Sequence, residues 1–266
     1  SSGSVFAIIA ALFALGPWLQ DPHGFVKIFA ATSFFFFLAA TIPVFFKEPE
    51  NVLAEECNKT AVSVRQHSFW KLFSDDSALV RLSIVAASFS AAIILFPHYQ
   101  AFARERFGVA SHSLLTWIIV QNIATGLASL VVGPLADHRG NRVVLIGLLG
   151  CCAGTPLFVA GLSMCSLPSG IQLFWLAYVP LGLNPIMLRI ISNYALELAP
   201  TVALQPRYVS LVGGALAIPF ILSPFVGWGI DVLGGVPFFI AGAVSIAFGT
   251  LTAVGLPEPR KSRLNI

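Results

Sequence analysis

The feature that most constrains this chain is a series of apolar runs of about twenty residues, each closed by a short polar turn. A run of that length can cross the hydrocarbon layer of a membrane as one helix. Since 57% of all residues are hydrophobic and 10% are charged, the composition excludes a water-soluble globular domain. The sequence therefore predicts an all-α polytopic membrane protein with eight transmembrane helices. They cover residues 5–19, 28–46, 82–102, 114–132, 143–162, 171–196, 209–230 and 236–256.

Lysine and arginine gather on one side of the membrane when these eight helices alternate in direction. That side holds the long polar segment 47–77 and both ends of the chain, and only Lys27, Arg104 and Arg106 fall on the other side. An excess of basic residues marks the cytoplasmic side. We therefore expect an integral protein of the plasma (inner) membrane with both termini in the cytoplasm. The basic residues on the cytoplasmic side are Lys47, Lys59, Arg65, Lys71, Arg81, Arg139, Arg142, Arg207, Arg260, Lys261 and Arg263.

The segment 133–142, between the fourth and fifth runs, has the highest density of polar residues of any segment between two runs in the second half of the chain. Gly133 and Gly140 give the backbone freedom for a short reversal between two membrane helices. Asp137 can sit near a helix N-terminus, where a negative charge is favoured, and Arg139 and Arg142 are close enough to pair with it.

An internal repeat relates the first two runs to the last two at an offset of 210 residues. The matched residues need no gap, and an offset of six helices keeps both copies in the same orientation, as parallel transporter repeats require. Chance matches among apolar residues are the alternative explanation. The most specific residues are Trp18, Asp21, Gly24, Glu48 and Pro49, which match Trp228, Asp231, Gly234, Glu258 and Pro259.

The loop and the repeat together resemble the major facilitator superfamily (MFS) of transporters. Its loop signature reads glycine, any residue, leucine, alanine, aspartate, basic, any residue, glycine, basic, basic. His138 and Asn141 depart from it, since both stand where the pattern prefers arginine or lysine. The residues that match are Gly133, Leu135, Ala136, Asp137, Gly140 and Arg142.

The resemblance implies that this chain corresponds to helices 5–12 of a 12-helix fold. Residues 1–46 would hold the last two helices of the N-terminal six-helix repeat, 47–77 the central cytoplasmic loop, 78–259 the C-terminal six-helix repeat and 260–266 a cytoplasmic tail. The first four helices would lie outside this sequence, and a complete transporter would need them.

The resemblance also implies a water-filled cavity lined by the third, fourth, sixth and seventh runs, where polar residues are candidates for binding a solute. Five of them have an alternative interpretation. Gln121 and Asn122 could bond between helices, His98 and Tyr99 could lie at the membrane interface, and Arg189 could extend to the headgroups along its own stem. The candidates are His98, Tyr99, Gln121, Asn122, Asn184, Arg189 and Asn193.

Proline and glycine predict local features of the helices. Pro180, Gly182 and Pro185 should interrupt the sixth run. The glycines at 147, 150 and 154 and at 213 and 214 suggest close helix packing.

The function implied by the resemblance is transport of a small solute by alternating access, without enzymatic activity, cofactor, metal or nucleic acid. The partners would be the solute and the lipid bilayer. The alternative is a membrane sensor or intramembrane enzyme of another class, and an enzyme should show a carboxylate or histidine cluster at one membrane face. The resemblance further implies a latch that joins the cytoplasmic ends of family helices eight and eleven when the cavity opens outward. The latch residues would be Gly133, Leu135, Ala136, Asp137, Arg139, Gly140 and Arg142.

Overall fold

A computed structural model describes residues 24–45, 72–73, 75–109, 113–165 and 167–258. All regular secondary structure in this part of the chain is helical. Six of its helical segments are long and apolar enough to cross a membrane, so the chain is an integral membrane protein. These spans are Ser77–Phe107, Ser113–Arg139, Asn141–Leu162, Ser169–Leu198, Val202–Leu233 and Gly235–Val254.

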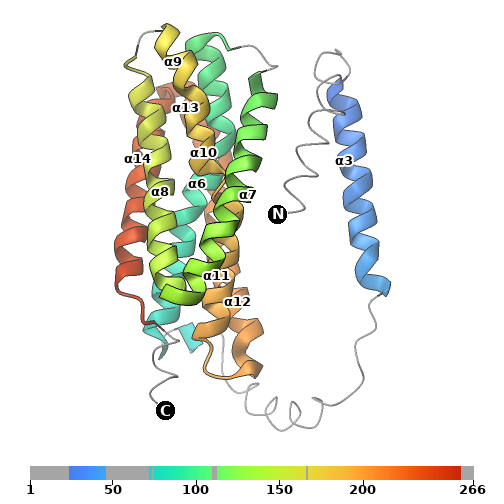
Figure 1. Ribbon diagram of the computed structural model, residues 1–266, viewed down its shortest axis with the longest axis vertical. Helices are drawn as coiled ribbons and strands as arrows, with labels where there is room; N and C mark the ends of the chain where they lie inside the picture. The colour runs from blue at the N-terminus through green and yellow to red at the C-terminus, as the bar shows by residue number, and fades with distance from the viewer. Residues whose placement is uncertain (1–23, 46–71, 74, 110–112, 166, 259–266) are drawn as a thin grey trace.

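The predicted count of eight spans is not confirmed. Run 5–19 lies outside the described residues, as do nearly all of segment 47–77 and tail 260–266. Run 28–46 overlaps α3 (Gly24–Thr41) and the 3-10 turn η2 (Ile42–Phe45), where the apolar stretch is shorter than in the six spans. Helix α3 stands to one side of the bundle (Figure 1). Half of the proposed internal repeat therefore falls largely on residues that the structure does not describe.

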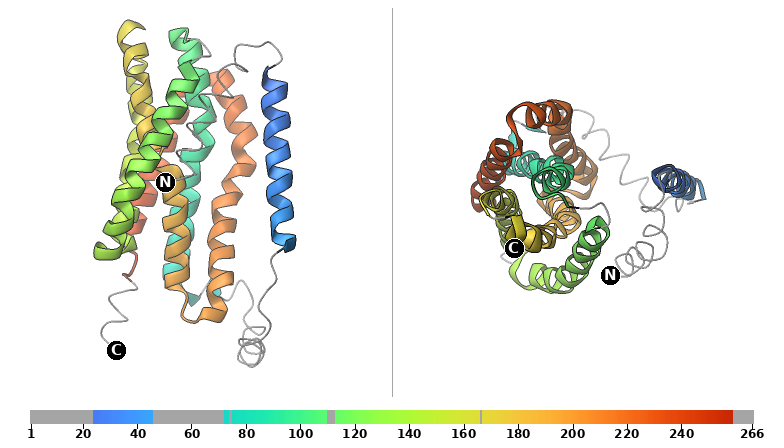
Figure 2. Two further views of the ribbon diagram at one scale, coloured as in Figure 1. Left: turned by 45° about the vertical axis from the view of Figure 1, so that its right-hand side comes forward. Right: turned by 90° about the horizontal axis from the view of Figure 1, so that it is seen from above.

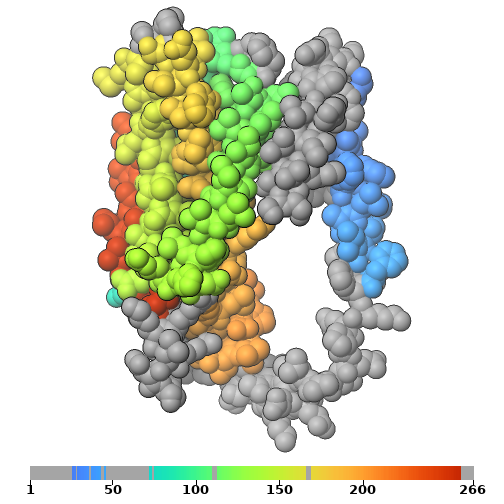
Figure 3. Space-filling model, viewed as in Figure 1, coloured from blue at the N-terminus to red at the C-terminus, as the bar shows by residue number. Residues whose placement is uncertain are grey.

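The bundle is built around α6 (Ser77–Phe107). Helix α14 (Gly235–Val254) packs along both α6 and α8 (Asn141–Leu162), while α12 (Gln205–Ala217) packs against α6 and α11 (Asn184–Leu198). Figure 2 shows this arrangement from the side and from above. Helix α7 (Ser113–Arg139) crosses the front of the bundle, with its first part on the side nearer α3 and its end on the far side (Figure 3).

Helix α6 starts where it does because Asp76 caps it. The Asp76 carboxylate accepts hydrogen bonds from the amides of Ala78, at 2.9 Å, and Leu79, at 3.1 Å. It thereby satisfies two amides that have no partner within the helix. Gly108 ends the helix with a left-handed backbone at φ 65°.

The span Ser169–Leu198 is broken, as the sequence predicted. Helix α9 (Leu167–Leu173), the 3-10 turn η3 (Phe174–Ala177) and α10 (Tyr178–Leu181) precede a turn and then α11. Gly182 lies in that turn, pressed against α7: a Cβ atom there would be 2.4 Å from the carbonyl oxygen of Gln121. Only glycine allows this approach.

The span Val202–Leu233 is also broken, which the sequence analysis did not predict. After η4 (Val202–Leu204) and α12, the 3-10 stretch η5 (Ile218–Leu222) separates α12 from α13 (Ser223–Leu233). Pro219 and Pro224 lack an amide hydrogen, so two helical hydrogen bonds are lost within one and a half turns. The chain tightens to 3-10 geometry there.

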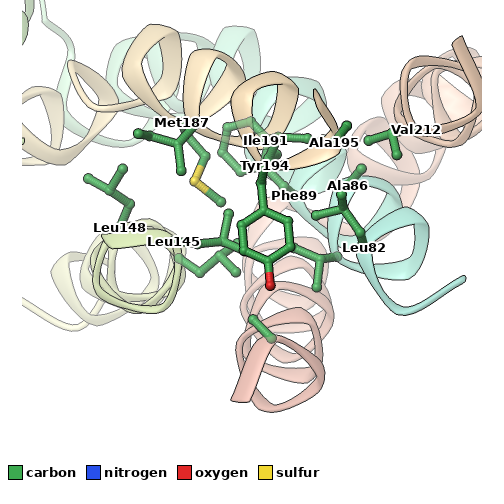
Figure 4. Packing of buried hydrophobic residues seen from close by; sticks show 14 of the residues in the cluster. Leu82, Ala86, Phe89, Leu145, Leu148, Met187, Ile191, Tyr194, Ala195 and Val212 are labelled. Carbon is green, nitrogen blue, oxygen red and sulfur yellow. The ribbon is translucent and has the colours of Figure 1, made fainter. Parts of the chain in front are cut away.

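Buried apolar side chains form two clusters, one in each half of the bundle. The cluster nearer the α7–α8 turn is mainly aliphatic and joins α6, α8, α11, α12 and α14 (Figure 4). The cluster at the opposite end is rich in aromatic rings, with Trp117 stacked on Tyr178 at 5.1 Å between ring centroids.

The prediction of close packing at five glycines is wrong. A Cβ atom on any of them would meet nothing within 4 Å, so these glycines face away from their described neighbours. Close contacts occur at Gly242 and Gly249 of α14 instead, where a Cβ would come within 2.2 Å of Leu95 and 2.7 Å of Ser88 on α6. The five open glycines are Gly147, Gly150, Gly154, Gly213 and Gly214.

Candidate functional site

The turn between α7 and α8 is much shorter than the predicted loop 133–142. Helix α7 continues to Arg139 and α8 begins at Asn141, so Gly140 alone lies outside both helices. Its φ is +87°, and its amide donates to the Ala136 carbonyl at 3.0 Å. A Cβ at this position would lie 2.5 Å from the carboxyl carbon of Glu258. The positive φ therefore requires glycine at position 140, and a larger residue would also displace the Glu258 side chain.

Asp137 lies in the last turn of α7, followed by His138 and Arg139, and all three side chains are exposed. The last turn of a helix presents carbonyl groups, which disfavour a negative charge and favour a positive one. Any helix N-terminus that stabilises the negative charge of Asp137 must therefore belong to an element other than α7.

Three side chains converge on the end of α14, at the same end of the bundle as the turn. The Arg142 guanidinium donates to the Val254 carbonyl, the Arg81 guanidinium to the Gly255 carbonyl and the Tyr194 hydroxyl to the Pro257 carbonyl. The last carbonyls of a helix have no intrahelical donor, and positive charge is favoured there. We call this set, which ties α6, α8 and α11 to α14, the carbonyl clamp.

Of these three donors, the sequence singled out only Arg142 as a site residue, and it indicated Arg81 only as a basic residue on the cytoplasmic side. Tyr194 has no charge that would single it out in the sequence. Glu258 appeared only as a member of the repeat. No sequence signal indicated that it would lie against Gly140.

A second polar contact at this end joins α6 to α12. The Tyr208 hydroxyl donates to the Asp76 carboxylate at 2.6 Å, and the Tyr208 side chain is buried. Asp76 thus caps one helix and holds the start of another. No sequence pattern indicated that Tyr208 would be its partner.

The polar side chains of α7 bond mainly within their own helix. Asn122 donates to the Ile118 carbonyl at 2.9 Å, so the predicted alternative of an interhelical bond does not apply to that contact. Thr125 makes the interhelical bond instead: its hydroxyl lies 2.6 Å from the Gly182 carbonyl and 2.9 Å from that of Gln121. Gln121 is half-exposed.

Arg189 and Asn193 lie one turn apart on α11, and both are exposed. Ile190 and Tyr194, which point toward the core, are buried. Arg189 stands nine residues before the end of α11 at Leu198, about 13 Å along the helix axis. A charge at that depth is costly unless water or a polar partner meets it.

The remaining candidates lie in different surroundings. His98 is half-buried beside Gly227 of α13, whose Cβ would be 3.7 Å from the imidazole Cε1. Tyr99 is fully buried and packs on Phe239 at 5.2 Å between ring centroids. Asn184, at the start of α11, accepts from the Cys152 thiol at 3.6 Å. The seven candidates therefore do not form one cluster.

Comparison with known proteins does not assign the chain to a family. No protein-family model matches the sequence, and no curated protein shows significant similarity to it. Within the described residues, no group of three or more His, Cys, Asp or Glu side chains is placed to hold a metal ion.

Proposed function

We propose that this protein is a secondary transporter of the MFS type that moves a small solute across the membrane by alternating access. The observation that carries the proposal is the pair of exposed polar side chains, Arg189 and Asn193, within a membrane-spanning segment. Facing lipid, an arginine at this depth would be costly. A water-filled pathway that carries a solute removes that cost.

The uneven burial of the six spans supports the same proposal. In the most apolar 18-residue stretch of each span, only 11% is buried within the bundle in α7 and in Val202–Leu233, against 61% in α6. In our proposal these two spans meet helices of the other six-helix repeat, including the four outside this sequence. Both ends of the chain and the carbonyl clamp would lie in the cytoplasm.

The α7–α8 turn serves as a conformational latch in this account. Asp137 is exposed at the end of the bundle where α12 also begins (Figure 1). When the cytoplasmic side closes, Asp137 would accept hydrogen bonds from amides at the start of α12, with Arg139 or Arg142 nearby. Such a latch contributes about 1–3 kcal/mol, enough to shift the ratio of inward to outward states by about one to two orders of magnitude.

Arg189 suggests an anionic or strongly polar solute. Its planar guanidinium can hold a carboxylate or phosphate through two parallel hydrogen bonds, which lysine cannot do. In the complete transporter, with the four further helices that the proposal requires, Arg189→Lys should therefore keep membrane insertion and impair transport of such a solute. If Arg189 only extends to the headgroups, the lysine variant will transport as the parent does.

Alternating access can be tested without knowing the solute. In a cysteine-free background, Gln121→Cys and Asn193→Cys are exposed to a membrane-impermeant thiol reagent from each side of the membrane in turn. We expect modification from both sides, and Asp137→Asn should raise the rate from the cytoplasmic side relative to the other. Val244→Cys, on the exposed face of α14, is the control that should stay unmodified. Unchanged relative rates in the Asp137→Asn variant would exclude the latch, and unreactive Gln121→Cys and Asn193→Cys would exclude the pathway.

A further inference from the structure

A cavity of about 510 Å³ lies between α6, the η5–α13 stretch and α14. Each element lines it with a single helical stripe, since the lining residues recur at spacings of three and four. On α6 the stripe runs from Ile84 to Leu95, about 16 Å along the axis. The lining contains no charged residue. It includes small side chains on two helices, Ala87 and Ala91 on α6 and Ala241 on α14.

The cavity has a closed floor and an open mouth. The floor is the seam where α6 meets α14, with Leu95 packed against Gly242 and Ser88 against Gly249. At the mouth, Ile84 and Leu222 are 36% and 56% exposed. The cavity is therefore open to the surroundings of the bundle at the depth of the membrane, and it is closed toward the core.

The cavity cannot close by a simple movement of η5 toward α6, because the helices before and after η5 are both held in place by contacts. Below η5, Tyr208 of α12 bonds to Asp76 at 2.6 Å. Above it, Gly229 of α13 lies against Phe238, whose ring a Cβ at 229 would approach within 2.3 Å. Between these contacts, Pro219 and Pro224 interrupt the α-helix, and the chain adopts the 3-10 geometry of η5.

We propose that this cavity binds one hydrocarbon chain of a membrane lipid. The cavity begins about 10 Å from the first residue of α6 and extends over about half the thickness of a hydrocarbon layer, which is the reach of a chain from one leaflet. The only hydroxyl group in the lining with a described hydrogen bond, that of Ser90, is satisfied by its own helix at the Ala87 carbonyl, 2.6 Å away. Ser88 and Ser245 carry the other two hydroxyl groups of the lining. An uncharged and mainly apolar space open at this depth is filled by hydrocarbon, because an empty cavity loses van der Waals contacts and no charged side chain there favours water over a lipid chain.

The proposal is tested by fluorescence quenching with phosphatidylcholine that carries bromine on its acyl chains. Val226, on the α13 side of the cavity, is changed to tryptophan, and the added fluorescence is taken as the difference from the parent protein in vesicles. Val244→Trp, on the outward face of α14, reports contact with bulk lipid. A blocking change, Ala91→Phe, is then placed in both reporters to fill the cavity.

We expect brominated lipid to quench the tryptophan at 226 as strongly as the one at 244. Ala91→Phe should lower the quenching at 226 by about twofold or more and leave that at 244 unchanged, because the ring occupies the space of the chain. Ser245→Leu offers a second way to fill the cavity if Ala91→Phe lowers the thermal unfolding midpoint. Absence of quenching at 226, or equal effects of the filling change on both reporters, would overturn the proposal.

Discussion

Helix α6 and the span Val202–Leu233 are almost equally apolar, yet they are buried to very different extents. Their most apolar windows have mean hydropathies of 2.2 and 2.0, but 61% of the first is buried and only 11% of the second. In water, this difference in burial would require a difference in hydrophobicity. In a membrane it does not, because lipid tails, or the helices of the other repeat in our proposal, can surround an apolar side chain as a protein core does. What distinguishes the two helices is packing geometry.

Packing geometry is visible in the small residues. Helix α6 meets α14 at Gly242 and Gly249, where the side chains of Leu95 and Ser88 pack directly on the glycine backbone. In Val202–Leu233, Gly213 and Gly214 face open space, and two prolines interrupt the helix at η5. A close helix contact in lipid gains van der Waals contacts, and an interrupted helix makes fewer of them along its length.

The largest effect is expected for Phe89→Ala on α6. Phe89 is fully buried, whereas Phe225 of α13 is 67% exposed, so Phe225→Ala is the matched control. Losing the buried ring should lower the free energy of unfolding by about 3 kcal/mol, and losing the exposed ring by under about 0.5 kcal/mol. Thermal unfolding midpoints in detergent measure both. Equal losses would show that the two helices are packed alike and would refute the contrast.

The next effect is expected at Gly140. Gly140→Ala forces an L-residue to φ +87° and brings its Cβ onto the Glu258 carboxyl group, so stability should fall by about 2 kcal/mol. Gly133→Ala is the control, because Gly133 is helical with open space beyond it and should gain up to about 1 kcal/mol. The same unfolding measurement applies. A tolerated alanine at 140 would mean that the turn adopts another conformation.

A smaller effect is expected from the carbonyl clamp. Arg142→Gln removes the guanidinium from the Val254 carbonyl and should destabilise the protein by about 1–2 kcal/mol. Arg139→Gln, at an exposed position in the last turn of α7, should change stability by under about 0.5 kcal/mol. Similar changes for both variants would remove Arg142 from the clamp.

The smallest effect is expected for two buried tyrosines. Tyr208→Phe loses the bond to Asp76 and should cost about 1 kcal/mol. The Tyr99 hydroxyl is buried and has no hydrogen-bond partner among the described residues, so Tyr99→Phe should be neutral or slightly stabilising. Destabilisation by Tyr99→Phe would reveal a partner or an internal water at that hydroxyl.

The sequence predicted features that depend on local chemistry. Runs of apolar residues located the six spans, Gly140 marked the turn, and Pro180 with Gly182 marked a break. It did not predict the break at η5, because Pro219 and Pro224 lie in a run whose hydropathy is uninterrupted. The extent of the α7–α8 loop was overestimated because Gly133 and Pro134 are common in loops, yet α7 tolerates both.

Features of the candidate site that depend on distant residues could not be predicted. The contacts of Tyr194 with Pro257, of Tyr208 with Asp76 and of Glu258 with Gly140 each join segments more than sixty residues apart. No local pattern encodes such pairs. The sequence singled out Arg189 as a polar residue within an apolar run, but it left open whether the side chain faces a cavity or extends to the headgroups.

The central claim is that the polar side chains of α7 and α11 face water within the membrane, whereas the outward face of α14 faces lipid. Spin labels at Gln121 and Val244 test it most directly, since each lies eight or nine residues from the start of its helix and so at a similar depth. The collision rate of each label is measured with oxygen, which concentrates in lipid, and with a water-soluble nickel chelate. The account predicts that nickel dominates at 121 and oxygen at 244. Dominance of oxygen at both positions would contradict a water-filled pathway and the transport function built on it.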